Sequence, residues 1–327
     1  MSLTARGRTP PNKDPGDQPM PKTRIVPAVV ACFFVVAPGA AAQQLQPRPV
    51  PTELVESLSF QSPSMGQRYA LNVSIPREFK PNDGKKYPAL IVTDGDWAFP
   101  GVNAGVRSLD GVIEPIFVIS IGTALEEGTQ AHVRRRVYEF SPPNWDRKDP
   151  FGEAVTKVCS DLRSEEGKCT GGAPKFLNAI VSELVPLVAA KYPIDTNQLG
   201  LFGISAGGFF ASWAMFQSNS PFKKYIISSP AMAYGDGAAF REEDRYAKEH
   251  KDLPISIYLG AGVLETFDPI LEGRGRIVSG MSHLAGVLSG RRYPGLKLVT
   301  EYHPGMGHTD VMGATVVRGL RTLYAKQ

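Results

Sequence analysis

Short apolar runs along the chain alternate with segments in which apolar residues recur at helical spacing. Residues 87–93 and 115–122 are almost continuously apolar, which is typical of strands buried on both faces in a parallel sheet. Residues 176–191 instead place apolar side chains three and four positions apart, which predicts a helix. The same patterns predict further strands at 57–61, 69–75, 199–202, 225–229, 255–260 and 296–303, and further helices at 103–110, 208–217, 239–251, 272–290 and 311–324.

Strands that alternate with helices predict an α/β fold, with a mostly parallel central sheet covered by helices on both faces. The alternation continues over 55–327 without an internal repeat or an interdomain linker, so we predict one domain there. The 230–255 segment is too short for a large lid domain. Residues 123–172 show no clear period and are expected to be the least regular part, whereas the proline-rich 43–54 segment is expected to be an extended leader.

The beginning of the chain is typical of a targeting segment. A basic stretch and a short apolar run occupy 20–36, and small residues follow at 37–42. The apolar run is too short to span a bilayer, so we predict a leader and signal peptide over 1–42, cut after Ala42, with Met20 as the true start. An uncleaved anchor is the alternative. The mature protein is then expected in the periplasm or outside the cell, without stable membrane insertion.

Charge and cysteine content narrow the functional classes. The net charge is +4, but residues 1–42 hold five basic and two acidic residues, so only about +1 remains and nucleic-acid binding is not expected. Cys32 would leave with the signal, and Cys159 and Cys169 are predicted to form a disulfide in an oxidising compartment. Two free thiols are the alternative. No metal site is expected there, because no histidine or third cysteine lies at ligand spacing.

Residues 203–207 form a G-x-S-x-G pentapeptide, between a predicted strand and a predicted helix. Such a turn lifts the serine hydroxyl off the sheet, and its glycines allow the strand and helix to cross closely. The motif alone also fits an ordinary glycine-rich turn, but its strand and helix context favours Ser205 as a nucleophile.

A serine nucleophile needs a general base, and that base needs an orienting acceptor. In α/β-hydrolases these follow the serine in the order acid, histidine. After Ser205 the chain offers Glu265, with Asp268 as second choice for the acid, and then His308 in a glycine-flanked loop. His303 is the rival base, at the end of a predicted strand. A Ser–His dyad without either carboxylate is a further alternative. The other histidines are less well placed in the chain: His132, His250 and His283.

The oxyanion of the intermediate needs preorganised N–H donors. We expect them to be the backbone amides of Ala206 and Asp96, or Trp97 in place of Asp96. The turn at 94–96 could also be only a tight turn. The basic triplet at 134–136 fits either solvated or ion-paired side chains or a site for a substrate anion.

These residues together resemble the esterase family of α/β-hydrolases that includes esterase D, the enterochelin esterases and related siderophore esterases. The resemblance covers roughly 55–325 and implies Ser205 as nucleophile, His308 as base and Asp96 as oxyanion donor. It departs at the acid, where Glu265 stands in a less acidic turn than is common, and in the cysteine-bounded loop. The motifs are Tyr87-Pro88, Asp94-Gly95, Phe176-Leu177, 183–186, Lys191-Tyr192, 203–208, Ser229-Pro230 and 305–308.

The sequence therefore predicts an exported serine carboxylesterase that acts through an acyl-enzyme, without a metal or organic cofactor, on siderophore-type or other small esters. Two alternatives remain open at this point. An acyltransferase would use the same triad with an alcohol acceptor, and a non-catalytic binding protein would keep only the scaffold.

Overall fold

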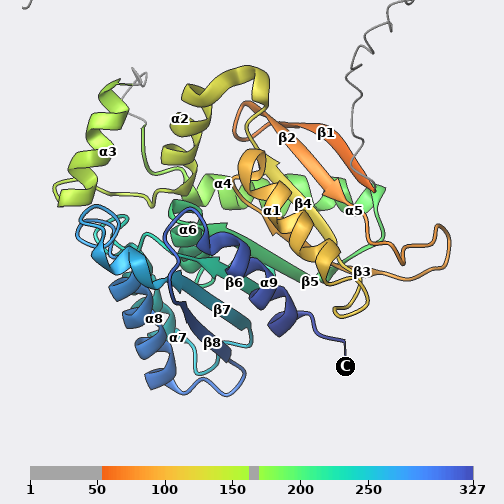
Figure 1. Ribbon diagram of the computed structural model, residues 1–327. Helices are drawn as coiled ribbons and strands as arrows, with labels where there is room; N and C mark the ends of the chain where they lie inside the picture. Colours follow the sequence, from red (N-terminus) through yellow and green to blue (C-terminus); the bar gives the residue numbers. More distant parts are fainter. Residues whose placement is uncertain (1–53, 162–168, 327) are drawn as a thin grey trace, which may run out of the picture. The chain divides into compact units, whose positions relative to one another are not determined.

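The computed structural model describes residues 54–161 and 169–326. The predicted signal peptide and start site lie outside these residues. Within them, eight strands form one sheet in the order β1-β2-β4-β3-β5-β6-β7-β8 (Figure 1). The β1–β2 and β2–β4 pairs are antiparallel, and all the other pairs are parallel. The strands are β1 (Val55–Ser62), β2 (Gln67–Ser74), β3 (Tyr87–Val92), β4 (Phe117–Gly122), β5 (Ile194–Ile204), β6 (Phe222–Ser228), β7 (Ser256–Gly262) and β8 (Lys297–His303).

Helices cover both faces of this sheet, as predicted. Leu90 and Val92 of β3 pack with α1 and α9 in one apolar cluster, whereas Ala89 and Ile91 belong to the cluster on the opposite face. Alternate side chains of a strand point to opposite faces, which is why a continuously apolar strand suits this position. The helices are α1 (Gly95–Ser108), α2 (Gly128–Phe140), α3 (Pro150–Asp161), α4 (Ala173–Ala179), α5 (Val185–Lys191), α6 (Ala206–Ala214), α7 (Ala238–Glu249), α8 (Ile277–Arg291) and α9 (Val311–Leu323).

The helix predicted at 176–191 is divided by a π-helical turn, η3 (Ile180–Leu184). Pro186 follows this turn and has no N–H for the carbonyl four residues earlier, so the regular bonding pattern cannot continue through it. The 173–191 segment is long and apolar enough to cross a membrane. Its apolar face, with Phe176, Ile180 and Leu184, is instead buried in the core, as expected of a core helix.

Two segments are more helical than predicted. Residues 123–172 are not irregular throughout, because they form α2 and α3. The helix predicted at 103–110 begins earlier, at Gly95, directly after β3. Three of the buried positions of α2 are Val137, Glu139 and Phe140, so an apolar stripe alone does not mark this helix.

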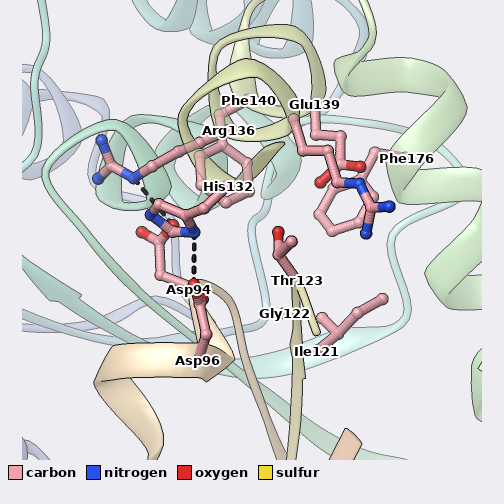
Figure 2. A pocket seen from close by; sticks show the side chains of 11 residues that line it. Asp94, Asp96, Ile121, Gly122, Thr123, His132, Arg136, Glu139, Phe140 and Phe176 are labelled. Carbon is pink, nitrogen blue, oxygen red and sulfur yellow. Dashed lines mark hydrogen bonds and ion pairs between the residues drawn. The ribbon is translucent and has the colours of Figure 1, made fainter. Parts of the chain in front are cut away.

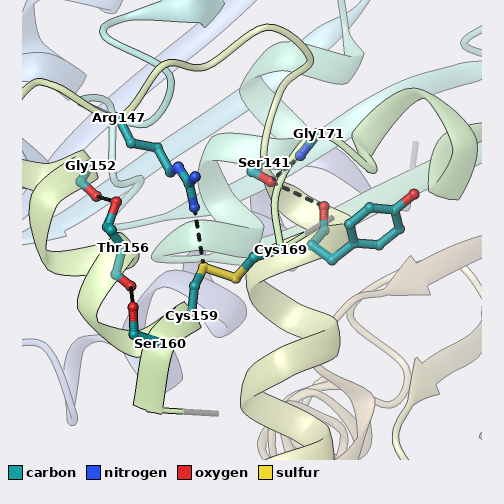
Figure 3. Close-up of a disulfide and its surroundings, with 9 residues drawn as sticks. Ser141, Arg147, Gly152, Thr156, Cys159, Ser160, Cys169 and Gly171 are labelled. Carbon is teal, nitrogen blue, oxygen red and sulfur yellow. Dashed lines mark hydrogen bonds between the residues drawn. A yellow bond between two sulfur atoms is a disulfide. The ribbon is translucent and has the colours of Figure 1, made fainter. Parts of the chain in front are cut away.

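The predicted disulfide between Cys159 and Cys169 is present (Figure 3). It joins α3 to the segment that leads into α4. Next to it, the Ser141 hydroxyl at the end of α2 accepts a hydrogen bond from the Gly171 amide, at 2.8 Å. The disulfide therefore lies where the end of α2 and the approach to α4 meet.

Candidate active site

Ser205 occupies the sharp turn between β5 and α6. Its φ of 57° and ψ of −118° are unfavourable for a residue with a Cβ, and its N–H donates to the Ser228 carbonyl, at 3.0 Å. A Cβ at Gly203 would lie 2.1 Å from the Gly207 carbonyl oxygen, and one at Gly208 would lie 2.9 Å from the Ser228 oxygen. Gly203 in the motif and Gly208 directly after it are therefore required by the close crossing of strand and helix.

The structure brings His308 and Glu265 together from the loops after β8 and β7. The His308 Nδ1 atom lies 2.5 Å from Glu265 Oε1, and the Glu265 side chain is fully buried. The other carboxylate oxygen of Glu265 accepts hydrogen bonds from the Ser229 hydroxyl at 2.7 Å and the Gly262 amide at 2.6 Å. Both oxygens are thus occupied, which fixes the carboxylate relative to the imidazole.

Ser229 also connects this pair to the serine turn. Two residues later, the Ala231 amide donates to the Ser205 carbonyl, at 2.9 Å. The segment after β6 therefore contacts Glu265 on one side and Ser205 on the other. Because β5, β7 and β8 run parallel, their carboxyl ends place the three loops at the same edge of the sheet.

The rival candidates make no hydrogen bond to His308 among the described residues. The Asp268 carboxylate accepts from the Ile270 and Leu271 amides, at 2.8 Å each, and these bonds, helped by the charge of His308, lower its pKa. His303 is buried, and its Nε2 lies 3.5 Å from the Tyr258 hydroxyl. Asp268 therefore stabilises a turn, and His303 packs beneath the site.

The Ser205 hydroxyl makes no hydrogen bond to an imidazole within the described residues. Such bonds are often long in an enzyme without substrate and tighten in the complex.

Two backbone amides of the site are free to bind an oxyanion. In the described part of the chain, neither the Ala206 nor the Asp96 amide donates a hydrogen bond, and both lie at helix N-termini. The Trp97 amide donates to the Asp94 carbonyl, which makes it the weaker candidate. A Cβ at position 122 would lie 2.5 Å from the Asp96 nitrogen, so Gly122 of β4 allows this turn to pack closely.

Two ion pairs that the sequence did not predict join helix α2 to the turn that bears Asp96 (Figure 2). His132 Nδ1 lies 2.5 Å from Asp96 Oδ2, and Arg136 Nε lies 2.8 Å from Asp94 Oδ1. Arg136 also reaches the Ile204 carbonyl next to the serine, at 3.4 Å. His132 precedes the serine in the chain, which made it a poor candidate for the base. Its spacing of four residues from Arg136 places both side chains on one face of α2, which becomes apparent only once the helix is known.

The rest of the basic triplet has different surroundings. Arg135 pairs with Glu127, and Arg134 is exposed. Two of the three arginines thus serve as ion-pair donors, in agreement with the structural interpretation of the triplet.

Burial is the main influence on the pKa of two carboxyl groups in this corner, Asp94 and Glu139. It raises the pKa of Asp94 despite the Arg136 guanidinium, and it raises the pKa of Glu139, whose carboxylate contacts the Tyr69 hydroxyl at 2.5 Å, to about 8. The hydrogen bond that the His132 imidazolium donates to the Asp96 carboxylate raises the pKa of His132.

A cavity of about 220 Å³ opens beside the Asp96 turn. It is large enough to hold part of a small organic substrate. Its lining residues are Asp96, Trp97, Thr123, Ala124, Gly128, Thr129 and His132. Among the described residues, no group of three or more histidine, cysteine, aspartate or glutamate side chains could hold a metal ion.

The sequence profile of the family described as Putative esterase matches residues 62–275. The chain belongs to this esterase family. The siderophore triacetylfusarinine C esterase of Aspergillus fumigatus is 26% identical to it over 301 residues, which cover 85% of this chain and 96% of that protein. The esterase is accordingly a carboxylic ester hydrolase of the serine hydrolase class.

Solved structures agree with this assignment at the level of the fold. The BES protein from Bacillus cereus has a TM-score of 0.69 at 23% identity, over 87% of this chain and all (100%) of that one. The siderophore hydrolase EstA from Aspergillus nidulans has a TM-score of 0.69 at 22% identity, over 86% and 98% of the two chains. The predicted α/β-hydrolase fold without a large lid is therefore confirmed.

Proposed function

We propose that the esterase hydrolyses its substrate through a triad of Ser205, His308 and Glu265, with the amides of Ala206 and Asp96 as the oxyanion hole. The observation that carries the proposal is the contact of His308 with the buried Glu265 carboxylate, at the sheet edge that bears the serine turn. A buried carboxylate at Nδ1 leaves Nε2 as the nitrogen that can accept the proton of the serine.

In the first half of the reaction, Ser205 Oγ forms a bond to the ester carbonyl carbon and its proton passes to His308 Nε2. The two free amides stabilise the negative charge on the carbonyl oxygen. The bond to the alcohol oxygen then breaks, and His308 returns the proton to the departing alcohol. Water attacks the acyl-enzyme with the same base, which releases the acid and restores the serine.

The proposed substrates are siderophore-type or other small esters, and the proposed location is outside the cytoplasm. The name of the Aspergillus fumigatus relative supports the substrate class. The signal pattern at 1–42 and the disulfide between Cys159 and Cys169 support export. Within residues 54–161 and 169–326, no large lid domain covers the edge at which the serine lies, which suits a bulky ester.

The test uses the mature protein and its Ser205→Ala variant with small aryl acetates and with siderophore esters. We expect the variant to lose essentially all hydrolysis, and a fluorophosphonate probe to label the unmodified protein at Ser205 alone. Equal rates for the two proteins would refute the proposal. Release of an ester product in the presence of added alcohols would instead indicate acyl transfer.

A further inference from the structure

Helix α2 contacts the Asp94–Asp96 turn through two charged side chains of its own. His132 and Arg136 are four residues apart and lie on one face of the helix, and the two aspartates are two residues apart. The helix therefore holds the turn at two points. The Asp96 amide, which donates no hydrogen bond among the described residues, belongs to the same residue whose carboxylate contacts His132.

The helix itself is fixed at its far end. The Gly172 amide donates to the Tyr138 carbonyl at 2.9 Å, and the Ala173 amide donates to the Ser141 carbonyl at 3.0 Å. A Cβ at Gly172 would lie 2.5 Å from the Tyr138 ring, so the contact is tight. Because these contacts fix the C-terminal end of α2, the helix can hold the Asp94–Asp96 turn in one position.

The backbone of the turn needs this support. Asp94 has a φ of 53°, in the left-handed region that a residue with a Cβ adopts at a cost. The Asp94 Oδ2 and Asp96 Oδ1 atoms are buried without a hydrogen-bond partner among the described residues. Each carboxylate thus depends on its one ion pair with α2, at Arg136 or at His132.

We infer that His132 is a positioning residue of the esterase, whose imidazolium holds the Asp96 carboxylate and thereby keeps the Asp96 amide aimed at the oxyanion. The inference rests on the proposed function. The Arg136 guanidinium, which contacts Asp94, stays protonated, whereas the His132 imidazolium, which contacts Asp96, can lose its proton. No contact of His132 with the ester is required.

The charges around His132 decide the direction of the pH effect. Asp96 and Asp94 stabilise the imidazolium, while burial and the Arg136 guanidinium oppose it, and the sum raises the pKa of His132. The pair is therefore complete below that raised pKa and weakens as the pH rises through it. The other charged groups that line this corner come from α2 itself, namely Arg135 and Glu139, and β4 and α4 contribute the uncharged Ile121, Gly122, Thr123 and Phe176.

The consequence is a bell-shaped pH dependence of kcat. Protonation of the general base lowers kcat on the acid side, and deprotonation of His132 lowers it on the alkaline side. Loss of a whole oxyanion donor lowers kcat by about 10²–10³, so a donor that is displaced but present should cost about tenfold. Because the oxyanion exists only in the transition state, KM should stay unchanged.

The experiment measures kcat and KM against pH for the unmodified esterase, His132→Gln and Asp96→Asn, with an aryl acetate. We expect each variant to lose the alkaline limb and to show a kcat about tenfold lower with the same KM. We expect the double variant to be no worse than either single one, because both changes remove the same pair. The matched control is His250→Gln, an exposed histidine whose ring stacks on Tyr246, which should keep the original profile.

An alkaline limb that persists in His132→Gln would overturn the inference, and so would an effect confined to KM. Asp96→Asn removes the same ion pair but leaves the backbone amide of residue 96 in place. This variant therefore still tests the inference if His132→Gln is unstable. Hydrolysis that depends on Ser205 but not on His132 refutes this inference alone. Hydrolysis that does not depend on Ser205 refutes the proposed function and the inference together.

Discussion

Replacing Glu265 with glutamine tests the triad most directly, because the structure fixes how the amide would lie. Oε2 accepts from the Ser229 hydroxyl and the Gly262 amide, so the glutamine oxygen must take this position. The NH₂ group then faces His308 Nδ1 and donates to it. His308 is left in the tautomer that carries its proton on Nε2, and in this form it cannot accept the proton of Ser205.

The size of the effect follows from the interactions that are lost. The carboxylate stabilises the imidazolium in the transition state by a charge-assisted hydrogen bond, which contributes about 1.5–3 kcal/mol. Reaching the active tautomer also breaks the new amide–imidazole bond, which costs about 1 kcal/mol. The sum of about 2.5–4 kcal/mol corresponds to a kcat lower by about 10²–10³, since about 1.4 kcal/mol is a factor of ten.

The assay is steady-state hydrolysis of an aryl acetate, with a thermal melt to show that Glu265→Gln is folded. Asp268→Asn is the matched control, because its side chain accepts from two backbone amides and makes no hydrogen bond to His308 among the described residues. It should keep kcat within about twofold. A Glu265→Gln variant within about threefold of the unmodified enzyme, while Ser205→Ala is inactive, would refute the reasoning and indicate a Ser–His dyad.

Two predictions concern stability. The pKa of Glu139 is about 8 in the folded protein, against an ordinary value of 4.5. Between these pH values the folded state holds a proton that the unfolded state releases. The contribution of this carboxyl to the free energy of unfolding therefore falls as the pH rises from 4.5 to about 8. In denaturant titrations across this pH range, the free energy of unfolding of Glu139→Gln should therefore rise relative to that of the unmodified protein by up to about 1.4 kcal/mol per pH unit. If the two free energies change in parallel with pH, the carboxyl is not protonated in the folded protein. Gly203→Ala should fail to form the turn, since its Cβ would lie 2.1 Å from a backbone oxygen, and should be recovered unfolded or inactive. The control is Gly286→Ala on α8, where an added Cβ meets no atom within 4 Å, and this variant should melt no lower than the unmodified protein. An active and stable Gly203→Ala variant would contradict the close crossing of strand and helix.

The strands and the serine turn could be predicted because both depend on local sequence. A strand buried on both faces must be apolar at every position, as in 87–92, and a close crossing must carry glycine, as at Gly203. These requirements are visible without knowledge of the neighbours. The order of acid and histidine after the serine then follows from the fold.

Helix α2 could not be predicted in this way, because part of its inward face is charged. His132 and Arg136 point to the two aspartates, and Glu139 is buried against Tyr69, so the helical period is carried by polar residues. The spacing of apolar residues therefore does not predict this helix. Only the fold shows that the partners lie across the sheet edge.

The choice between Glu265 and Asp268 depended on the fold for the same reason. Both carboxylates follow β7 within a few residues, so sequence alone makes Glu265 the first choice and leaves Asp268 as the second. The short 3₁₀ helix η4 (Val263–Phe267) turns Glu265 inward and leaves Asp268 outside. Burial, which is a property of the fold, distinguishes the two side chains.

The backbone of Ser205 has a consequence for engineering. A side chain held at a φ of 57° and a ψ of −118° costs about 1–3 kcal/mol that glycine would not. Libraries screened only for survival at high temperature would therefore enrich glycine at position 205 and discard the proposed nucleophile. Thermostable variants of this enzyme have to be selected with turnover as a second criterion in every round.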